Sequence, residues 1–271
     1  MYLRRITPAD RRGVVDFLDP RTLMLRWLVA FVRHQDLLPE EEESYWSLWI
    51  GARDEEPISC VAAHFFQNGT TYICAAPEAD LAAVEALCDE SLLPERLVGD
   101  REVLDRWMES SPGFFEGAAG KKEVEVLAFG KGSEVPFGFR AATREDVDIL
   151  EQYGQQFSVE TGTDTPGDFD SLVKNGLVYV FEEGGKVEGY VRSNLSDGRY
   201  VHAGGLYVHP AYRGKGVGRA LALGIGATVR AAEGATVILD VDLDNEKALR
   251  AYRSAGYDKV GSGLEITRVS G

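Results

Sequence analysis

The sequence predicts an α/β protein with two lobes, each a copy of one unit of strands and helices. Three observations indicate this fold class. The chain has 271 residues, and a domain usually contains about 100 to 150. A glycine-rich polar segment that ends in proline, residues 130–136, divides it into halves. The stretch after this segment resembles the start of the chain, so we expect lobes at residues 1–132 and 137–271.

The two halves begin alike. Residues 3–10 and 139–146 each read as a short strand that runs into a Thr-x-x-Asp sequence, at Thr7 and at Thr143. The threonine can cap the N-terminus of a helix, and the aspartate favours the first helical turn. Each lobe is therefore expected to open with a strand followed by a helix.

The order of the predicted strands repeats as well. Alternating apolar residues and turn dipeptides predict three strands in each half: residues 46–50, 58–66 and 70–75, then 177–181, 187–192 and 200–208. The second half continues with a helix over 219–232, which ends before Gly234, and a buried strand over 236–241. A helix capped by Asn245 and a final hairpin over 257–260 and 264–269 complete it.

Composition excludes several classes of function. The net charge of −15 disfavours nucleic-acid partners and anionic membrane surfaces, and it suits a cationic acceptor. The three cysteines fit free, buried thiols in a reducing cytoplasm. No signal peptide or membrane-spanning run is found, and the histidines lack the spacing of metal ligands, so no metal is expected.

Residues 206–220 carry the most specific pattern in the chain. They follow a predicted strand and open a predicted helix. Glycines at 214, 216 and 218 would let a ligand approach the backbone, and the N–H groups and dipole of a helix N-terminus favour an anion. Arg213, Lys215 and Arg219 add positive charge. This combination is typical of a diphosphate-binding loop.

Two other phosphate loops fit less well. A Walker loop needs Ser or Thr after Gly-Lys, and here Gly216 follows Lys215. A dinucleotide fold needs G-x-G-x-x-G, whereas the spacing here is G-x-G-x-G, although Asp240 could serve as a ribose carboxylate. A glycine-rich turn with incidental cations is the simplest alternative.

Residues 208–218 instead match the pattern V-x-P-x-x-R-G-x-G-x-G/A of the GNAT acetyltransferases. Residues 245–257 are similar to the N-x-x-A-x-x-x-Y-x-x-x-G-F/Y pattern of the same family. The resemblance covers the whole second lobe. It implies two tandem GNAT-like folds, each a central mixed β-sheet flanked by helices, with acetyl-CoA as co-substrate.

The resemblance also implies which residues hold the cofactor. The pantetheine arm would lie between two splayed parallel strands, and the diphosphate would lie on the glycine loop. The residues so placed are Leu206, Tyr207, Val208, Arg213, Gly214, Lys215, Gly216, Val217, Gly218, Arg219, Ala220, Asn245 and Tyr252.

Three residues are candidates for catalysis. The resemblance implies that Tyr252 protonates the departing thiolate, whereas most helix tyrosines simply pack in a core. His202, on a central strand, could accept the proton of the amine because imidazole titrates near neutral pH. Glu160 is the other candidate base. Asp240 and Asp242 could hold a cationic substrate or could be solvated strand ends.

The first lobe lacks the same features. Acidic residues in 78–85 replace the glycine loop, and Trp107 occupies the position of Tyr252. The layout resembles bacterial two-lobed GNAT proteins with a degenerate first lobe, and more distantly the mycothiol synthases. We therefore expect cofactor binding in the second lobe alone.

The predicted function is transfer of an acetyl group to a primary amine of a small molecule or peptide, by direct attack. The alternative is an acyl-CoA-binding sensor without catalysis. Both need the glycine loop, and only the enzyme needs Tyr252. The acceptor, the length of the acyl chain and a homodimeric state stay open, because the acceptor loops of a fold vary most.

Overall fold

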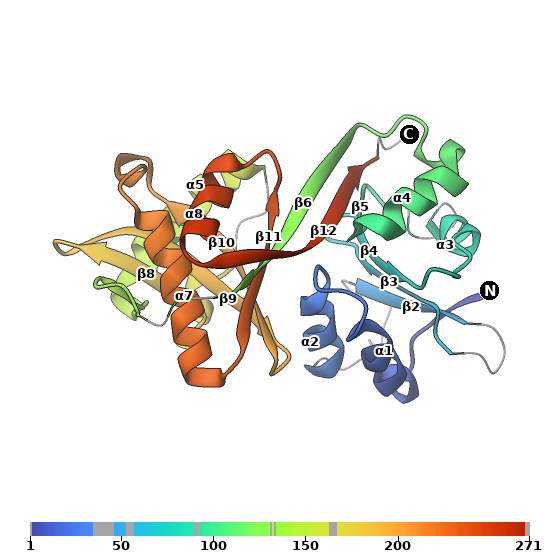
Figure 1. Ribbon diagram of the computed structural model, residues 1–271, viewed down its shortest axis with the longest axis horizontal. Helices are drawn as coiled ribbons and strands as arrows, with labels where there is room; N and C mark the ends of the chain where they lie inside the picture. The colour runs from blue at the N-terminus through green and yellow to red at the C-terminus, as the bar shows by residue number, and fades with distance from the viewer. Residues whose placement is uncertain are drawn as a thin grey trace. The chain divides into compact units, whose positions relative to one another are not determined.

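A computed structural model describes residues 2–34, 46–52, 57–88, 92, 94–130, 132, 134–162 and 167–268. The chain forms two compact units. The first contains residues 1–126, 242–244 and 260–271, and the second contains residues 127–241 and 245–259. Figure 1 gives the element labels used below. Two residues of the predicted linker, Lys131 and Ser133, lie outside the described part.

The first unit is a mixed sheet with two pairs of helices. Its elements are β1 (Tyr2–Arg5), η1 (Pro8–Asp10), α1 (Arg11–Leu18), α2 (Arg26–His34), β2 (Trp46–Ala52), β3 (Cys60–Phe65), β4 (Thr70–Ala75), α3 (Ala82–Leu87), β5 (Arg96–Asp100), α4 (Arg101–Ser110), η3 (Pro112–Phe115) and β6 (Gly120–Phe129). The strands β1 to β4 are antiparallel neighbours, and β4 is parallel to β5. Cys60, Cys74 and Cys88 are buried, as the sequence predicted.

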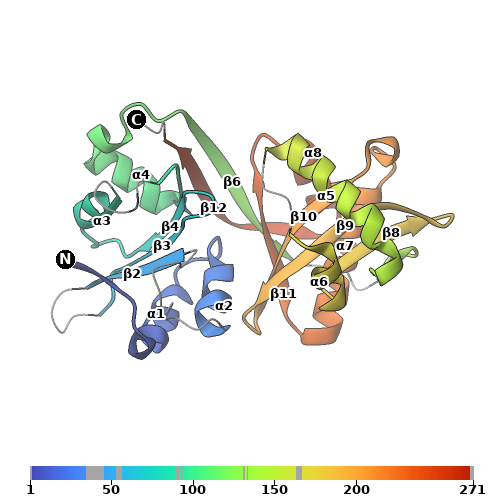
Figure 2. The same cartoon turned by 180° about the vertical axis from the view of Figure 1, so that it is seen from behind.

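The second unit repeats this order. Its elements are β7 (Phe139–Ala141), η4 (Arg144–Asp146), α5 (Val147–Thr161), α6 (Phe169–Lys174), β8 (Val178–Glu183), β9 (Lys186–Ser196), β10 (Tyr200–Val208), η5 (Pro210–Tyr212), α7 (Val217–Glu233), β11 (Thr236–Asp242), α8 (Glu246–Ser254) and β12 (Tyr257–Thr267). The strands β7 to β10 are antiparallel neighbours, and β10 is parallel to β11. Helices α7 and α8 cover one face of this sheet, and α5 and α6 cover the other (Figures 1 and 2).

The predicted similarity between the first strand and turn of each half is confirmed in atomic detail. Asp10 accepts hydrogen bonds from the Thr7 backbone N–H (2.8 Å) and from both terminal nitrogens of Arg4. Asp146 accepts the equivalent bonds from Thr143 (2.7 Å) and Arg140. The arginine bonds lower the pKa of both carboxyls, so each stays ionised and fixes the first turn.

The end of the chain differs from the prediction. The expected hairpin over 257–260 and 264–269 is wrong, because β12 is one continuous strand. Its later part pairs with β5 of the first unit, from Gly263↔Asp100 to Thr267↔Arg96. Gly263 lies inside this strand, where a Cβ would collide with Met24. Residues 260–271 are thus grouped with the first unit, whereas the sequence assigned them to the second lobe.

Candidate functional site

The parallel strands β10 and β11 separate soon after they begin. They pair at Tyr200↔Thr236, Val201↔Val237 and His202↔Ile238, and no pair joins them beyond His202, although both strands are described throughout. On its other side β10 stays paired with β9 as far as Val208↔Gly189. The backbone of Leu206 and Val208 therefore has no strand partner toward β11, and the Val208 carbonyl accepts a hydrogen bond from Arg213 Nε instead. A strand edge without a strand partner can bond the amides of an extended ligand.

A tight glycine turn connects β10 to α7. Gly214 and Gly216 have φ values of +77° and +89°, which favour glycine, and a Cβ on either would meet no atom within 4 Å. Gly216 caps the helix, and the first helical bond runs from Ala220 N–H to the Gly216 carbonyl. The N–H groups of residues 217–219 therefore point out of the end of a helix of 17 residues. This is a suitable site for a phosphate group.

The third loop glycine has a packing role. A Cβ on Gly218 would lie 3.7 Å from Val208 and 3.8 Å from Ala251, and Leu206 is 4.0 Å away. The start of α7 thus lies close to the end of β10 and to α8. Val217 is buried, and Tyr207 is buried with its hydroxyl donating to Gln156 Oε1 (2.7 Å). The backbone of Tyr207 pairs with Tyr190 of β9, so Tyr207 turns neither its backbone nor its hydroxyl toward the gap.

The cations of the loop have different partners. Arg213 Nε donates to the Val208 carbonyl (2.8 Å), and Arg213 Nη2 contacts both carboxylate oxygens of Glu160 on α5 (2.6 and 2.9 Å). Two predicted site residues, Arg213 and Glu160, therefore meet as an ion pair that braces the loop. Arg219 Nε donates to the Ser254 carbonyl at the end of α8 (3.0 Å), and Lys215 lies over the Tyr212 ring. Lys215 and Arg219 stay exposed beside the helix N-terminus.

Helix α8 positions two of the predicted residues. Asn245 is its N-cap, and its side chain accepts a hydrogen bond from the Ala248 N–H (3.1 Å). Tyr252 is half-buried, and its ring packs edge-on against Tyr257 at 5.6 Å. Burial and the negative charge of Asp240 raise the pKa of Tyr252, so its hydroxyl keeps the proton at neutral pH.

His202 bridges three neighbouring strands. Its Nε2 lies 2.7 Å from Asp240 Oδ1 on β11, and its Nδ1 lies 3.1 Å from Asn194 Nδ2 on β9. Burial acts to raise the pKa of Asp240, but the hydrogen bond from His202 outweighs it and holds that pKa below its usual range. A carboxylate is an acceptor alone, so Nε2 donates to it and Nδ1 accepts from the amide.

Sequence reasoning missed Asn194 and the contact between Glu160 and Arg213. The signal for Asn194 was the alternation of β9, which places Asn194 on the same face as Arg192 and Tyr190. No local signal joined Glu160 to Arg213, because 53 residues separate them.

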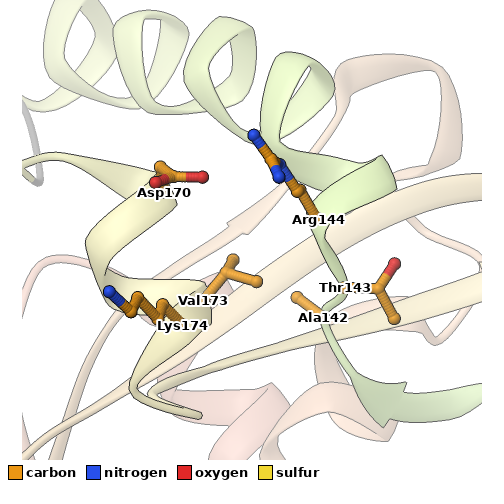
Figure 3. Close-up of a pocket in the computed structure, with 6 residues that line it drawn as sticks. All are labelled: Ala142, Thr143, Arg144, Asp170, Val173 and Lys174. Atoms are coloured by element: carbon orange, nitrogen blue, oxygen red, sulfur yellow. The ribbon is translucent and has the colours of Figure 1, made fainter.

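A pocket of about 480 Å³ lies elsewhere in the second unit (Figure 3). Its lining residues come from the segment around η4 and from α6: Ala142, Thr143, Arg144, Asp170, Val173 and Lys174. None of them belongs to the predicted site. In the described part of the chain no helix is long and apolar enough to cross a membrane. The described residues also contain no cluster of three His, Cys, Asp or Glu side chains able to hold a metal ion.

Comparison of the sequence with known proteins finds similarity in the second unit. A sequence model of the acetyltransferase (GNAT) family matches residues 147–257. The N-alpha-acetyltransferase RimI of Mycobacterium tuberculosis is 44% identical over 64 residues, which are 24% of this chain and 39% of that protein. An uncharacterised protein of Mycobacterium leprae is 44% identical over 56 residues, 21% of this chain and 15% of that protein. The chain thus spans well under two thirds of both relatives.

Solved structures resemble the whole chain at low sequence identity. A GCN5-related N-acetyltransferase from Sphaerobacter thermophilus has a TM-score of 0.64 at 17% identity, over 97% of this chain and 94% of that one. A GNAT-family acetyltransferase from Colwellia psychrerythraea has a TM-score of 0.63 at 13% identity, over 99% and 100%. A tandem GNAT protein from the clavulanic acid biosynthesis pathway has a TM-score of 0.63 at 13% identity, over 99% and 98%.

These likenesses confirm the predicted fold class, an α/β protein of the tandem GNAT type. The family match begins at the first residue of α5 and ends at the first residue of β12, so it contains both parallel strands, the glycine turn and α8. Residues 147–257 of this chain are therefore similar to the acetyltransferase (GNAT) family over the stretch that contains the glycine turn and α8.

Proposed function

We propose that this chain is an acetyl-CoA-dependent N-acetyltransferase that acetylates a primary amine of a small molecule or peptide. The observation that carries the proposal is the gap between β10 and β11, which opens beside a glycine turn at the N-terminus of α7. The two features suit the two parts of coenzyme A. The backbone of Leu206 and the N–H of Val208, which have no β11 partner, suit the pantetheine amides, and the helix N-terminus suits the diphosphate.

The diphosphate is proposed to bind the N–H groups of residues 217–219, with Lys215 and Arg219 nearby as cations. Arg213 acts differently in this proposal. Because its guanidinium is bonded to Val208 and Glu160, it holds the loop to α5 and contributes less to the charge around the phosphates. Asn245 helps indirectly, by capping the helix that carries Tyr252.

The reaction is a direct attack of the neutral amine on the thioester carbonyl carbon. The new C–N bond forms, the C–S bond breaks, and backbone N–H groups near Val208 stabilise the oxyanion. Tyr252 donates its proton to the departing thiolate. An ordered water accepts the proton of the amine, because both ring nitrogens of His202 are already engaged by Asp240 and Asn194. Glu160 is the weaker candidate, because both of its oxygens are bound to Arg213.

An acceptor screen tests the proposal. The protein is incubated with acetyl-CoA and a panel of primary amines and peptides, and the release of free thiol is followed. We expect turnover with at least one amine. Tight binding of acetyl-CoA with no turnover on a broad panel would instead favour the acyl-CoA-binding sensor. The three buried cysteine thiols support a reducing, cytoplasmic setting for either function.

A further inference from the structure

Asp240 lies at the point where the two parallel strands separate. It is two residues beyond Ile238, the last residue of β11 that pairs with β10. Residues two apart on a strand share a face, and Ile238 pairs with His202. The carboxylate is therefore next to the imidazole of the neighbouring strand, to which it is hydrogen-bonded.

Asn194, His202 and Asp240 form a hydrogen-bonded array, and the Asp240 carboxylate is its most exposed charged group. His202 uses both ring nitrogens, one toward Asp240 and one toward Asn194, and 15% of its side chain is exposed. The Asp240 side chain is 42% exposed. A ligand approaching this array thus meets the carboxylate before it can reach a ring nitrogen of His202.

The environment keeps Asp240 anionic and close to the proposed chemistry. The hydrogen bond from His202 stabilises the charged form of the carboxyl. The charge of Asp240 acts in turn on the hydroxyl of Tyr252, so the two groups lie within electrostatic reach of each other. An alkylamine is an ammonium ion at neutral pH, because its pKa is about 10. A fixed carboxylate beside the thioester site is complementary to such an ion.

We propose that Asp240 binds the ammonium group of the acceptor, and that His202 and Asn194 are positioning residues that hold this carboxylate. The inference rests on the proposed function and names its substrate class, cationic primary amines. Asp240 selects the acceptor by charge. It brings the nitrogen to the gap between β10 and β11, where the thioester of the proposed reaction would lie and where the ammonium group loses one proton to water before the neutral amine attacks.

Steady-state kinetics with an acceptor from the screen test this assignment. Asp240→Asn keeps an acceptor oxygen for His202 and removes the charge. A hydrogen bond to a charged group contributes about 1.5 to 3 kcal/mol, so the KM for the amine should rise about 10- to 100-fold. The kcat and the KM for acetyl-CoA should change far less. A fall in kcat with an unchanged KM for the amine would overturn the proposal.

Two matched variants sharpen the result. Asp242→Asn removes the same charge two residues further along β11, where the carboxylate lies near Lys122. It should leave the KM for the amine unchanged, and an equal rise in both variants would overturn the proposal. His202→Gln keeps an N–H donor for Asp240, so it should preserve the KM better than His202→Leu. Equal losses in these two variants would count against the positioning role.

A binding measurement separates this inference from the proposed function. The His202 ring signal in the NMR spectrum is identified by its loss in His202→Gln. Titration with n-butylammonium chloride should shift that signal to saturation in the wild type and leave it unmoved in Asp240→Asn, and n-butanol should have no effect. A shift without turnover of any amine would refute the proposed function and support the ammonium site. Turnover without a shift, and with equal KM in Asp240→Asn, would refute the ammonium site.

Discussion

The parallel strand pairs of the two units begin alike and end differently. In the first unit β4 pairs with β5 at four consecutive positions, from Thr70↔Arg96 to Ile73↔Gly99, and β4 ends two residues later. In the second unit β10 continues for six residues beyond its last pair with β11. A Cβ on Gly99 would lie 2.7 Å from the Ile73 carbonyl oxygen, so the first pair is in close contact at its end. The first pair is closed and the second is open.

Side chains of α4 also occupy the region after the parallel strands in the first unit. In the first unit Arg106 of α4 donates to the carbonyls of Ala76 (2.9 Å) and Pro77 (2.6 Å), the backbone directly after β4. The neighbouring Trp107 is fully buried and stacks on Phe114 at 4.9 Å. The loop over residues 76–81 has no glycine, and α3 has only six residues. The same fold thus has an open pair of parallel strands in one unit and a closed pair in the other, depending on the loop and helix that follow the strands.

The largest effect is expected for Gly216→Glu, which should abolish acetyl-CoA binding beside the open strand pair β10 and β11. Gly216→Glu places bulk and negative charge at the N-terminus of α7, so calorimetry should detect no acetyl-CoA binding. Gly234→Glu is the matched control, because Gly234 also has a positive φ (+66°) and open space, at the other end of the same helix. We expect one acetyl-CoA per chain in the wild type and in the control. Two sites, one of them surviving Gly216→Glu, would contradict the contrast between the units.

The next effect concerns Tyr252, which corresponds to Trp107 of the closed unit. Tyr252→Phe keeps the ring and its packing on Tyr257, so the Tm should change little. General acid catalysis contributes about 100- to 10,000-fold, and kcat should fall by an amount in that range. The KM for acetyl-CoA should change far less, because the lost interaction matters mainly in the transition state.

The control for this change is Tyr179→Phe, which removes a hydroxyl from a ring stacked on Phe139 in β7. It should leave kcat unchanged. Single-turnover measurements exclude product release as the limiting step. If Tyr252→Phe reacts at the wild-type rate in a single turnover, Tyr252 is a packing residue like Trp107.

A smaller effect tests the residue that caps α4. Asp100 corresponds to Asn245, but burial raises its pKa to about 6. An unfolded aspartate titrates near pH 4, so the folded protein binds the proton more tightly and loses stability as pH rises from about 4 to above 6. Asp100→Asn removes this cost. The variant should be more stable than the wild type at pH 8, by at most about 3 kcal/mol, and equally stable at pH 4.

Urea unfolding at the two pH values measures the difference. Glu109→Gln removes an exposed carboxylate from the same helix and serves as the control for net charge. A gain at pH 8 in both variants would show that the effect comes from the net charge of −15 and not from the buried cap.

The sequence predicted the parts of this fold that depend on local chemistry. The Thr-x-x-Asp openings, the cap at Asn245 and the stop at Gly234 each follow from the preferences of a few adjacent residues, and all are found. The course of β12 was not predictable in this way, because it depends on contacts with β5 and Met24, far away in the sequence. The bridge from Asn194 through His202 to Asp240 depends on register across three strands, which composition does not reveal.

The smallest effect is expected for Glu160→Gln, which tests whether Glu160 only holds the glycine loop through Arg213 (a brace) or acts as the general base. The ion pair with Arg213 is about half exposed, 46% and 41% for the two side chains, and an exposed pair contributes about 0 to 1 kcal/mol. As a brace, Glu160→Gln keeps one oxygen as an acceptor for Arg213, so the Tm, the affinity for acetyl-CoA and kcat should all stay close to wild type. If Glu160 is a general base, the carboxylate is essential, and kcat should fall about 100-fold or more in Glu160→Gln while acetyl-CoA still binds.

Arg213→Gln is the matched change on the other partner of the ion pair. It removes both the contact with Glu160 and the bond to the Val208 carbonyl, and it should weaken acetyl-CoA binding more than Glu160→Gln does, because the glycine turn is then no longer tied to the end of β10. A large loss of kcat in Glu160→Gln alone would make Glu160 the base and leave His202 with its structural bridge.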